Sequence, residues 1–191
     1  MVIIVWESIF SFITKPKDGE SVYFFFGVEY ARTDDMYVDF DKVKPTYVKH
    51  IDITYYSTRM TAFDSVFVIR GQSQADIFVL PESYCEPTMM KSVFYPMDLS
   101  VVKEIFGEDV ECDKATCDGK VYGLKIYDKE TDTGKAKEYF TYTYFEDGVE
   151  QAVGDYYIFF GKNSLHLGKL SGSELNGALV LAQAVLDKKA E

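Results

Sequence analysis

The sequence is poor in the residues that most often carry catalysis or bind metals. Its 191 residues include two histidines, His50 and His166, three cysteines and one tryptophan. It contains no G-x-x-x-x-G-K phosphate loop, no G-x-G-x-x-G fingerprint, no H-E-x-x-H motif and no G-x-S-x-G nucleophile elbow. These absences argue against the common nucleotide-binding, zinc-hydrolase and α/β-hydrolase classes. We therefore expect neither a cofactor nor a metal.

Positive charge is also scarce, since 20 Lys and Arg stand against 31 Asp and Glu, for a net charge of -11. Such a surface repels nucleic-acid phosphates and anionic membranes, which excludes both as partners. The acidic cluster of residues 34–41 lacks the central glycine and the final glutamate of a calcium loop. We interpret this cluster, within the irregular segment 31–45, as a solvated polar loop.

The chain has no apolar run of the roughly 20 residues that a membrane-spanning helix needs. Residues 1–14 are mainly apolar, but they lack the basic start and small-residue cleavage site of a secretory signal. We interpret residues 1–18 as an N-terminal apolar segment or an anchor remnant; a first strand or a packed amphipathic helix stay as alternatives. Residues 19–191 fit a single domain.

The cysteines leave two possibilities open. Cys112 and Cys117 are separated by four residues and followed by an Asp-Gly turn signal. They form either a disulfide clip, in an oxidising compartment, or a pair of free thiols. A zinc site needs about four ligands, and too few lie nearby in the sequence. Cys85 has no sequence partner.

The pattern of apolar residues predicts an α/β fold with a mostly parallel sheet and flanking helices. The 15 Tyr and 15 Phe favour strands. Strands are expected at 21–30, 50–57 and 76–80, with a helix between the last two that follows Thr61 and ends at Gly71. A strand, a helix and a strand joined closely form a βαβ unit, and hence a parallel pair. Further strands are predicted at 119–128, 138–145 and 155–163, and helices at 86–93, 99–109 and 171–191.

Polar residues follow the predicted buried strand 76–80. Pro81 ends the strand, because proline cannot donate to the sheet, and Glu82, Ser83 and Tyr84 come next. In open α/β sheets, ligands bind beyond the carboxyl ends of the strands. These residues therefore lie either at the rim of a cleft or in a plain strand-to-helix turn, with Ser83 or Glu86 as the helix cap.

Three stretches resemble segments of the extracellular solute-binding proteins of ABC importers, which have a type 2 periplasmic-binding fold. "AFDSVFVIRGQSQADIFVLPES" is similar to the helix and strand that lead to the ligand cleft, and "CDGKVYGLKIYD" to the "DGKxYGLP" strand that leaves the first lobe. "DYYIFFGKNSLHLGKL" resembles the returning segment. The resemblance covers much of residues 50–187 in order.

The sequence departs from that family in two places. Lys125 replaces the proline of "YGLP", and only residues 127–155 stand where a full-length relative builds its second lobe. About thirty residues can form a β-hairpin but not a lobe. The resemblance therefore implies a first-lobe-like domain with a short hairpin in place of the second lobe.

The resemblance implies a noncatalytic extracellular protein, possible membrane attachment through the N-terminus, and greater plausibility for the Cys112–Cys117 clip. The expected ligand is a small polar molecule, such as a carbohydrate, or a protein partner; the candidate ligand-binding residues are Glu82, Ser83, Tyr84 and Asn163. An alternative is a structural or interaction module, such as a homodimer, that uses the surface exposed by loss of the second lobe. A lesser alternative is a hydrolase based on Ser164 and His166, which would need an activated hydroxyl and an orienting carboxylate.

Overall fold

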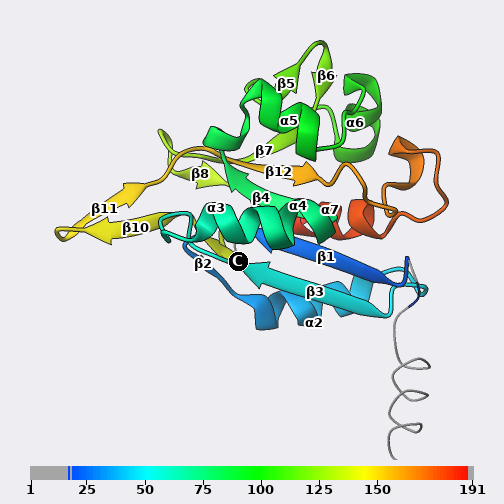
Figure 1. The fold of residues 1–191 in the computed structure, drawn as a ribbon, viewed down its shortest axis with the longest axis horizontal. Helices are drawn as coiled ribbons and strands as arrows, with labels where there is room; N and C mark the ends of the chain where they lie inside the picture. The colour runs from blue at the N-terminus through cyan, green and yellow to red at the C-terminus, as the bar shows by residue number, and fades with distance from the viewer. Residues whose placement is uncertain (1–16, 18, 189–191) are drawn as a thin grey trace, which may run out of the picture.

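The computed structural model describes residue 17 and residues 19–188 (Figure 1). All but residue 17 of the predicted apolar segment 1–18 therefore lies outside the described residues. Within the described part, no helix combines the length and the apolar composition needed to cross a membrane. The centre is a six-stranded sheet in the order β3-β1-β4-β12-β7-β8. These strands are β1 (Ser21–Phe26), β3 (His50–Tyr55), β4 (Ile77–Pro81), β7 (Gly123–Asp128), β8 (Thr133–Gly134) and β12 (Tyr156–Phe160).

The sheet is mixed, with a parallel core. β1 runs parallel to both β3 and β4, so the two strands of the predicted βαβ unit are parallel as expected, but β1 lies between them and they do not pair directly. β12 runs antiparallel to β4 on one side and to β7 on the other. The predicted α/β class is thus confirmed, and β4 is an inner strand as expected. The direction of β12 decides which residues share an edge of the sheet.

Side-chain alternation along the inner strands divides the core into two layers. Phe24, Val79 and Ile158 pack on one face of the sheet, whereas Phe25 and Phe78 pack on the other. All five residues of β4 and all five of β12 are buried, as expected for inner strands covered on both sides.

Helices cover both faces. Buried residues of α2 (Thr33–Val43), α6 (Leu99–Phe106) and α7 (Gly177–Asp187) belong to the first layer. Residues of α3 (Phe63–Val66), η1 (Phe67–Gly71) and α5 (Pro87–Val93) belong to the second. The arrangement is therefore a sheet between two layers of helices (Figure 1).

Two local expectations were wrong. Segment 31–45 is not an irregular loop, because α2 occupies most of it. Met36 and Phe40 are one helical turn apart and fully buried, so tertiary packing stabilises a helix whose sequence is mostly polar. The helix predicted before β4 does not end at Gly71 either, since the chain continues through the π-helical turn η1 into α4 (Gln72–Gln74). A β-carbon at Gly71 would lie 2.9 Å from the Phe67 ring, so close packing explains this glycine.

Short strands complete the fold, including the predicted hairpin. β10 (Thr143–Glu146) pairs with β11 (Val149–Ala152), and the hairpin projects beyond the sheet at the end where β4 terminates (Figure 1). Its turn residues Asp147 and Gly148 both have positive φ, which suits the twist of a tight hairpin. Two smaller pairs join β2 (Tyr30–Ala31) to β9 (Phe140–Thr141) and β5 (Thr116–Cys117) to β6 (Lys120–Val121).

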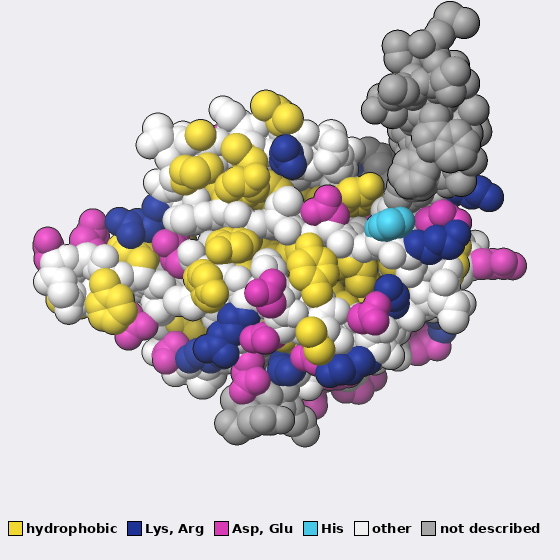
Figure 2. Space-filling view, turned by 90° about the horizontal axis from the view of Figure 1, so that it is seen from below, with side chains coloured by type: hydrophobic (Ala, Val, Ile, Leu, Met, Phe, Trp, Pro, Cys, Tyr) yellow, Lys and Arg dark blue, Asp and Glu magenta, His cyan; other side chains and the backbone are white. Residues whose placement is uncertain are grey.

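Strand β3 forms one margin of the sheet. The Ile53 N–H points away from β1 and donates to the hydroxyl of Tyr37 on α2, at 3.1 Å. Tyr37, Val38 and Tyr55 around this edge are 38%, 59% and 36% exposed. Figure 2, seen from this side, shows hydrophobic side chains among charges of both signs. The β3 edge is thus only partly protected against pairing with another chain.

Candidate functional site

Three neighbouring strands bring polar residues to one edge of the sheet. β4 ends at Pro81, β7 ends at Asp128, and β12 begins at Tyr156, which pairs with Pro81 on one side and with Tyr127 on the other. The Glu82 N–H donates to the Asp155 carbonyl oxygen at 2.8 Å, so the two backbones meet directly. A bulge between Tyr156 and Tyr157 shifts the register against β7. Bulges of this kind reorient side chains, often beside functional sites.

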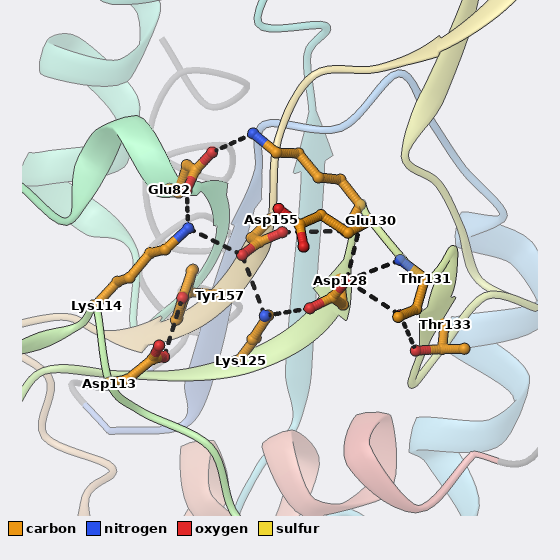
Figure 3. Close-up of polar contacts among 11 residues, drawn as sticks. Glu82, Asp113, Lys114, Lys125, Asp128, Glu130, Thr131, Thr133, Asp155 and Tyr157 are labelled. Carbon is orange, nitrogen blue, oxygen red and sulfur yellow. Dashed lines mark hydrogen bonds and ion pairs between the residues drawn. The ribbon is translucent and has the colours of Figure 1, made fainter.

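Six charged side chains form a network at this edge, here called the charged cluster (Figure 3). Glu82 binds the ammonium groups of Lys114 at 2.5 Å and of Lys129 at 2.9 Å. Asp155 binds Lys114 at 3.2 Å and Lys125 at 3.1 Å. Lys125 also binds Asp128 at 2.6 Å. The members of the charged cluster are Glu82, Lys114, Lys125, Asp128, Lys129 and Asp155.

Asp155 and Lys125 form the inner part of the charged cluster. Their side chains are 5% and 12% exposed, and Asp155 also accepts the Lys129 N–H at 3.0 Å. Burial raises the pKa of Asp155, but the Lys129 N–H and the ammonium groups of Lys125 and Lys114 outweigh burial and bring the pKa below 3.8. Burial lowers the pKa of Lys125, and Asp128 and Asp155 more than compensate. The inner pair is therefore ionised at neutral pH.

Glu82, Lys114 and Lys129 form the outer, accessible part. Hydrogen bonds from Lys114 and Lys129 lower the pKa of Glu82 below 4.5, and those to Glu82 and Asp155 raise the pKa of Lys114. The two lysine side chains are 47% and 40% exposed. An ammonium group has three donors, and Lys129 uses one of them on Glu82. Donors that face solvent beside a fixed carboxylate can bind a polar ligand.

Asp128 fixes the loop that follows β7. Its Oδ1 accepts the N–H groups of Glu130 and Thr131, at 2.9 and 3.0 Å, and the Thr131 hydroxyl at 3.0 Å. Lys125 and these donors hold the pKa of Asp128 well below its usual range. The loop therefore presents the outer lysine, Lys129, from a defined position.

The structure separates the residues predicted at the end of β4. Glu82 lies in the charged cluster, and Ser83 is exposed beside it in the 3₁₀ turn η2 (Glu82–Tyr84). Tyr84 instead packs edge-on against Phe67, with ring centroids 4.9 Å apart, and its hydroxyl donates to Asp64. Burial is the largest cause of its raised pKa. Tyr84 thus anchors the turn to the helix layer.

The alternative of a strand-to-helix turn is also realised. The Glu86 carboxylate accepts the Met89 N–H at 3.0 Å and caps α5, with Pro87 at the first position of the helix. Glu86 therefore caps the helix while Glu82 belongs to the charged cluster.

Asn163 does not lie with the other predicted residues. β12 runs antiparallel to β4, so Phe160 at its end pairs with Ile77 at the start of β4. Asn163 follows Phe160 and is exposed at the opposite edge of the sheet. The sequence pattern shows that 155–163 is a buried strand, but not its direction, and the direction removes Asn163 from the site.

Ser164 and His166 are not arranged as a nucleophile and its base. The Ser164 hydroxyl donates to the buried carboxylate of Asp76 at 2.5 Å. His166 contacts this hydroxyl through its backbone N–H, while its ring stacks parallel to that of Tyr47. The His166 side chain is 2% exposed. These contacts connect the start of β4 to the segment before α7 and leave the imidazole without access to a substrate.

The cysteines are three free thiols in the structure. Cys112 packs against the core layer that contains Phe24, whereas Cys117 packs against the layer that contains Phe25. The Cys112–Cys117 clip stays a prediction. Burial, together with nearby Glu82, raises the pKa of Cys85 to about 12. In residues 17 and 19–188, no group of three His, Cys, Asp or Glu side chains is placed to hold a metal ion.

A cavity of about 290 Å³ adjoins the charged cluster and shares Lys125 and Asp128 with it. Its apolar wall is built from Phe106 at the end of α6, Leu124 and Ile126 on β7, and Leu186 on α7. The volume lies near the lower end of the range for small-molecule pockets, which combine an apolar wall with a few polar groups. Gly134 forms part of the boundary, since a β-carbon there would lie 2.5 Å from the Ile126 carbonyl oxygen.

The sequence did not identify five members of the charged cluster. Asp128 and Asp155 flank apolar strands in the same way as Glu82, and this signal could have revealed them. Lys125 stood out as a departure from a family pattern. Lys114 and Lys129 lie in loops with no pattern that marks them.

No protein-family model matches the sequence, and neither does any curated protein. Parts of solved structures do match. The galacto-N-biose/lacto-N-biose I-binding protein of an ABC transporter from Bifidobacterium longum is 12% identical, with a TM-score of 0.41, over 56% of this chain and 28% of that one. The maltose-binding periplasmic protein from Listeria monocytogenes is 16% identical, with a TM-score of 0.38, over 63% and 32%. Thiaminase I from Bacillus thiaminolyticus is 14% identical, with a TM-score of 0.38, over 56% and 28%.

The matches thus include ABC substrate-binding proteins and an enzyme, and they extend over about half of this chain. The chain spans about a third of the length of these structures. No ligand or activity follows from these similarities.

Proposed function

We propose that this chain is a noncatalytic binding domain that holds a small polar ligand at the edge of the sheet formed by the charged cluster and the adjoining cavity. The observation that carries the proposal is the cavity of about 290 Å³ whose lining includes two members of a fixed ionic network. Charged groups held in place before binding lose little entropy when a ligand arrives. Glu82, Ser83, Lys114 and Lys129 provide the outer polar contacts.

A thermal-shift screen tests this proposal. Monosaccharides, disaccharides, amino acids, organic acids and organic amines are each added at millimolar concentration. Binding to the folded state alone stabilises it by about 2.7 kcal/mol at a hundredfold excess over Kd, a shift of several degrees. If no compound of any class raises the midpoint, the proposal fails.

Variants locate the binding. Thr133 lines the cavity and is exposed to solvent, so Thr133→Trp narrows the cavity without placing a large side chain in the core. The ligand-induced shift should disappear in this variant. Val149→Trp, in the exposed β10–β11 hairpin, is the matched control and should keep the full shift. A shift that survives Thr133→Trp would place the ligand elsewhere.

The second candidate function is an interaction module, for which the exposed apolar side chains around the β3 edge are the specific observation. An edge strand with outward N–H groups can pair with a strand of another chain. Light scattering at high concentration distinguishes a homodimer from a monomer. Extracellular location and membrane attachment through residues 1–18 remain parts of the proposal that fractionation of cells expressing the full chain can test.

A further inference from the structure

The mouth of the cavity carries acidic groups that the rest of the protein does not neutralise. Asp109 and Glu111 follow α6, line the cavity and are exposed. Neither carboxylate forms an ion pair with another residue that the structure describes. The Glu111 backbone carbonyl accepts the Lys125 N–H at 2.7 Å, which holds this segment against β7. Two carboxylates without an ion pair therefore line the cavity beside its apolar wall.

The other charges of the lining are largely compensated. Lys125 binds both Asp128 and Asp155, so its ammonium group is already paired with two carboxylates. Lys135, which follows β8, is the remaining positive group of the lining. Asp109 and Glu111 against Lys135 leave one net negative charge at the mouth. The overall charge of -11 adds to the attraction of cations.

A bare metal ion does not suit this place. It requires several oxygen, nitrogen or sulfur ligands directed at one point. No such group of side chains is found among the described residues. The cavity instead offers apolar surface on the partly exposed Phe106 and Val110, and a ligand gains free energy by covering that surface.

From these contacts we infer that the ligand of the cavity is a small organic cation, an ammonium group on an apolar body. The apolar body lies against the wall, and the ammonium group binds Asp109 and Glu111. This inference rests on the proposed function, since it names the ligand class of the same cavity.

Three probes of nearly equal size separate charge from shape: 2-phenylethylamine, 2-phenylethanol and 3-phenylpropionate. Their binding is measured by calorimetry at pH 7 and low salt. The amine should bind at least about threefold more tightly than the alcohol, and the acid most weakly, as expected for partly exposed ion pairs. Raising the salt concentration should weaken binding of the amine and leave binding of the alcohol unchanged.

Charge-neutralising variants then assign the residues. Asp109→Asn and Glu111→Gln should each weaken amine binding by about two- to fivefold, without effect on the alcohol. Lys135→Gln removes the opposing cation and should strengthen amine binding by about twofold. Glu108→Gln is the matched control, because Glu108 is the neighbouring acid, pairs with Lys103 and does not line the cavity.

The outcomes separate this inference from the proposed function. If the alcohol or the acid binds as tightly as the amine, or if Asp109→Asn and Glu111→Gln leave the amine unaffected, the organic-cation class is wrong and the cavity remains a binding site. The class is also wrong if another compound of the screen binds in a Thr133-dependent way and the amine does not. If no compound of any class binds, the proposed function itself is refuted.

Discussion

Replacing Asp155 with asparagine removes the central negative charge of the charged cluster while keeping the size of the side chain. The Asp155 carboxylate binds Lys114 and Lys125 and accepts the Lys129 N–H. An asparagine oxygen can still accept that N–H, but it offers no charge to the two ammonium groups. Lys125 then keeps Asp128 as its carboxylate partner, and Lys114 keeps Glu82.

The expected cost follows from burial. Breaking a fully buried ion pair costs about 3–5 kcal/mol, whereas an exposed pair contributes about 0.2–1 kcal/mol. The Asp155–Lys125 pair, whose side chains are 5% and 12% exposed, should cost close to the value for a buried pair. The Asp155–Lys114 pair, with Lys114 about half exposed, should contribute close to the value for an exposed pair. Because Lys125 retains one partner, we expect Asp155→Asn to lower the free energy of unfolding by about 2–3 kcal/mol at pH 7.

Glu82→Gln is the matched control. Glu82 is 26% exposed and its two lysine partners are 47% and 40% exposed, so this change should cost only about 0.5–1 kcal/mol. Urea unfolding followed by circular dichroism measures both variants. A double-mutant cycle of Asp155→Asn with Lys125→Met should give a coupling energy of about 1 kcal/mol or more. The reasoning is refuted if Asp155→Asn costs less than about 0.5 kcal/mol, or no more than Glu82→Gln.

Three further predictions concern pH, packing and thiol reactivity. The pKa values of Glu82 and Asp155 are lowered in the folded protein, so these carboxylates add stability above their ordinary pKa values of 4.5 and 3.8. That stability is lost as the pH falls through the lowered values. The pKa values of Lys114 and Lys129 are raised, so they add stability that is present below pH 10.5 and is lost as the pH rises through the raised values. Unfolding free energies across pH should therefore decline on both sides of neutrality, and a maximum below pH 4 would contradict the assignment. Phe94→Ala removes a fully buried ring whose centroid lies 4.2 Å from that of Phe159, and it should lower the free energy of unfolding by about 3–5 kcal/mol in the same urea assay. The control Phe145→Ala, at a residue that is 71% exposed, should change it by no more than about 0.5 kcal/mol. Equal costs would show that Phe94 is not in a packed core. The pKa of Cys85 is raised to about 12, so little thiolate forms at pH 8. Iodoacetamide should therefore alkylate Cys85 at least about a hundredfold more slowly in the folded protein than in the unfolded protein, as measured by mass spectrometry. Similar rates would place the thiol in a solvated site.

Much of the fold could be predicted from the sequence where the signal is local. The apolar runs of β3 and β4, with the helix between them, have a periodicity that distinguishes strand from helix and predicts that the two strands run parallel; that β1 lies between them in the sheet was not predicted. The short stretch between β7 and β12 is too small for a lobe, and it contains the predicted hairpin. Helix α2 was missed because Met36 and Phe40 are its buried residues, and two buried residues give a weak pattern.

The candidate site was predicted only in part. Glu82 was recognised because it directly follows a buried strand, and the same reasoning applied to Asp128 and Asp155 would have extended the site. Lys114 and Lys129 lie in loops that are 32 and 47 residues from Glu82 in the sequence, and no local pattern connects such distant groups. Asn163 was placed at the wrong edge, because side-chain alternation is the same for either direction of a strand.

The sequence by itself determined that the inner strands β4 and β12 are buried, that β3 and β4 run parallel, and that no second lobe can be built between β7 and β12. These properties depend on residue type and spacing along the chain. Only the tertiary structure decided that β12 is antiparallel, that the six charges meet at one edge, and that a cavity with acidic groups at its mouth lies beside them. Those features depend on which strands become neighbours, and the packing of the whole core selects that arrangement.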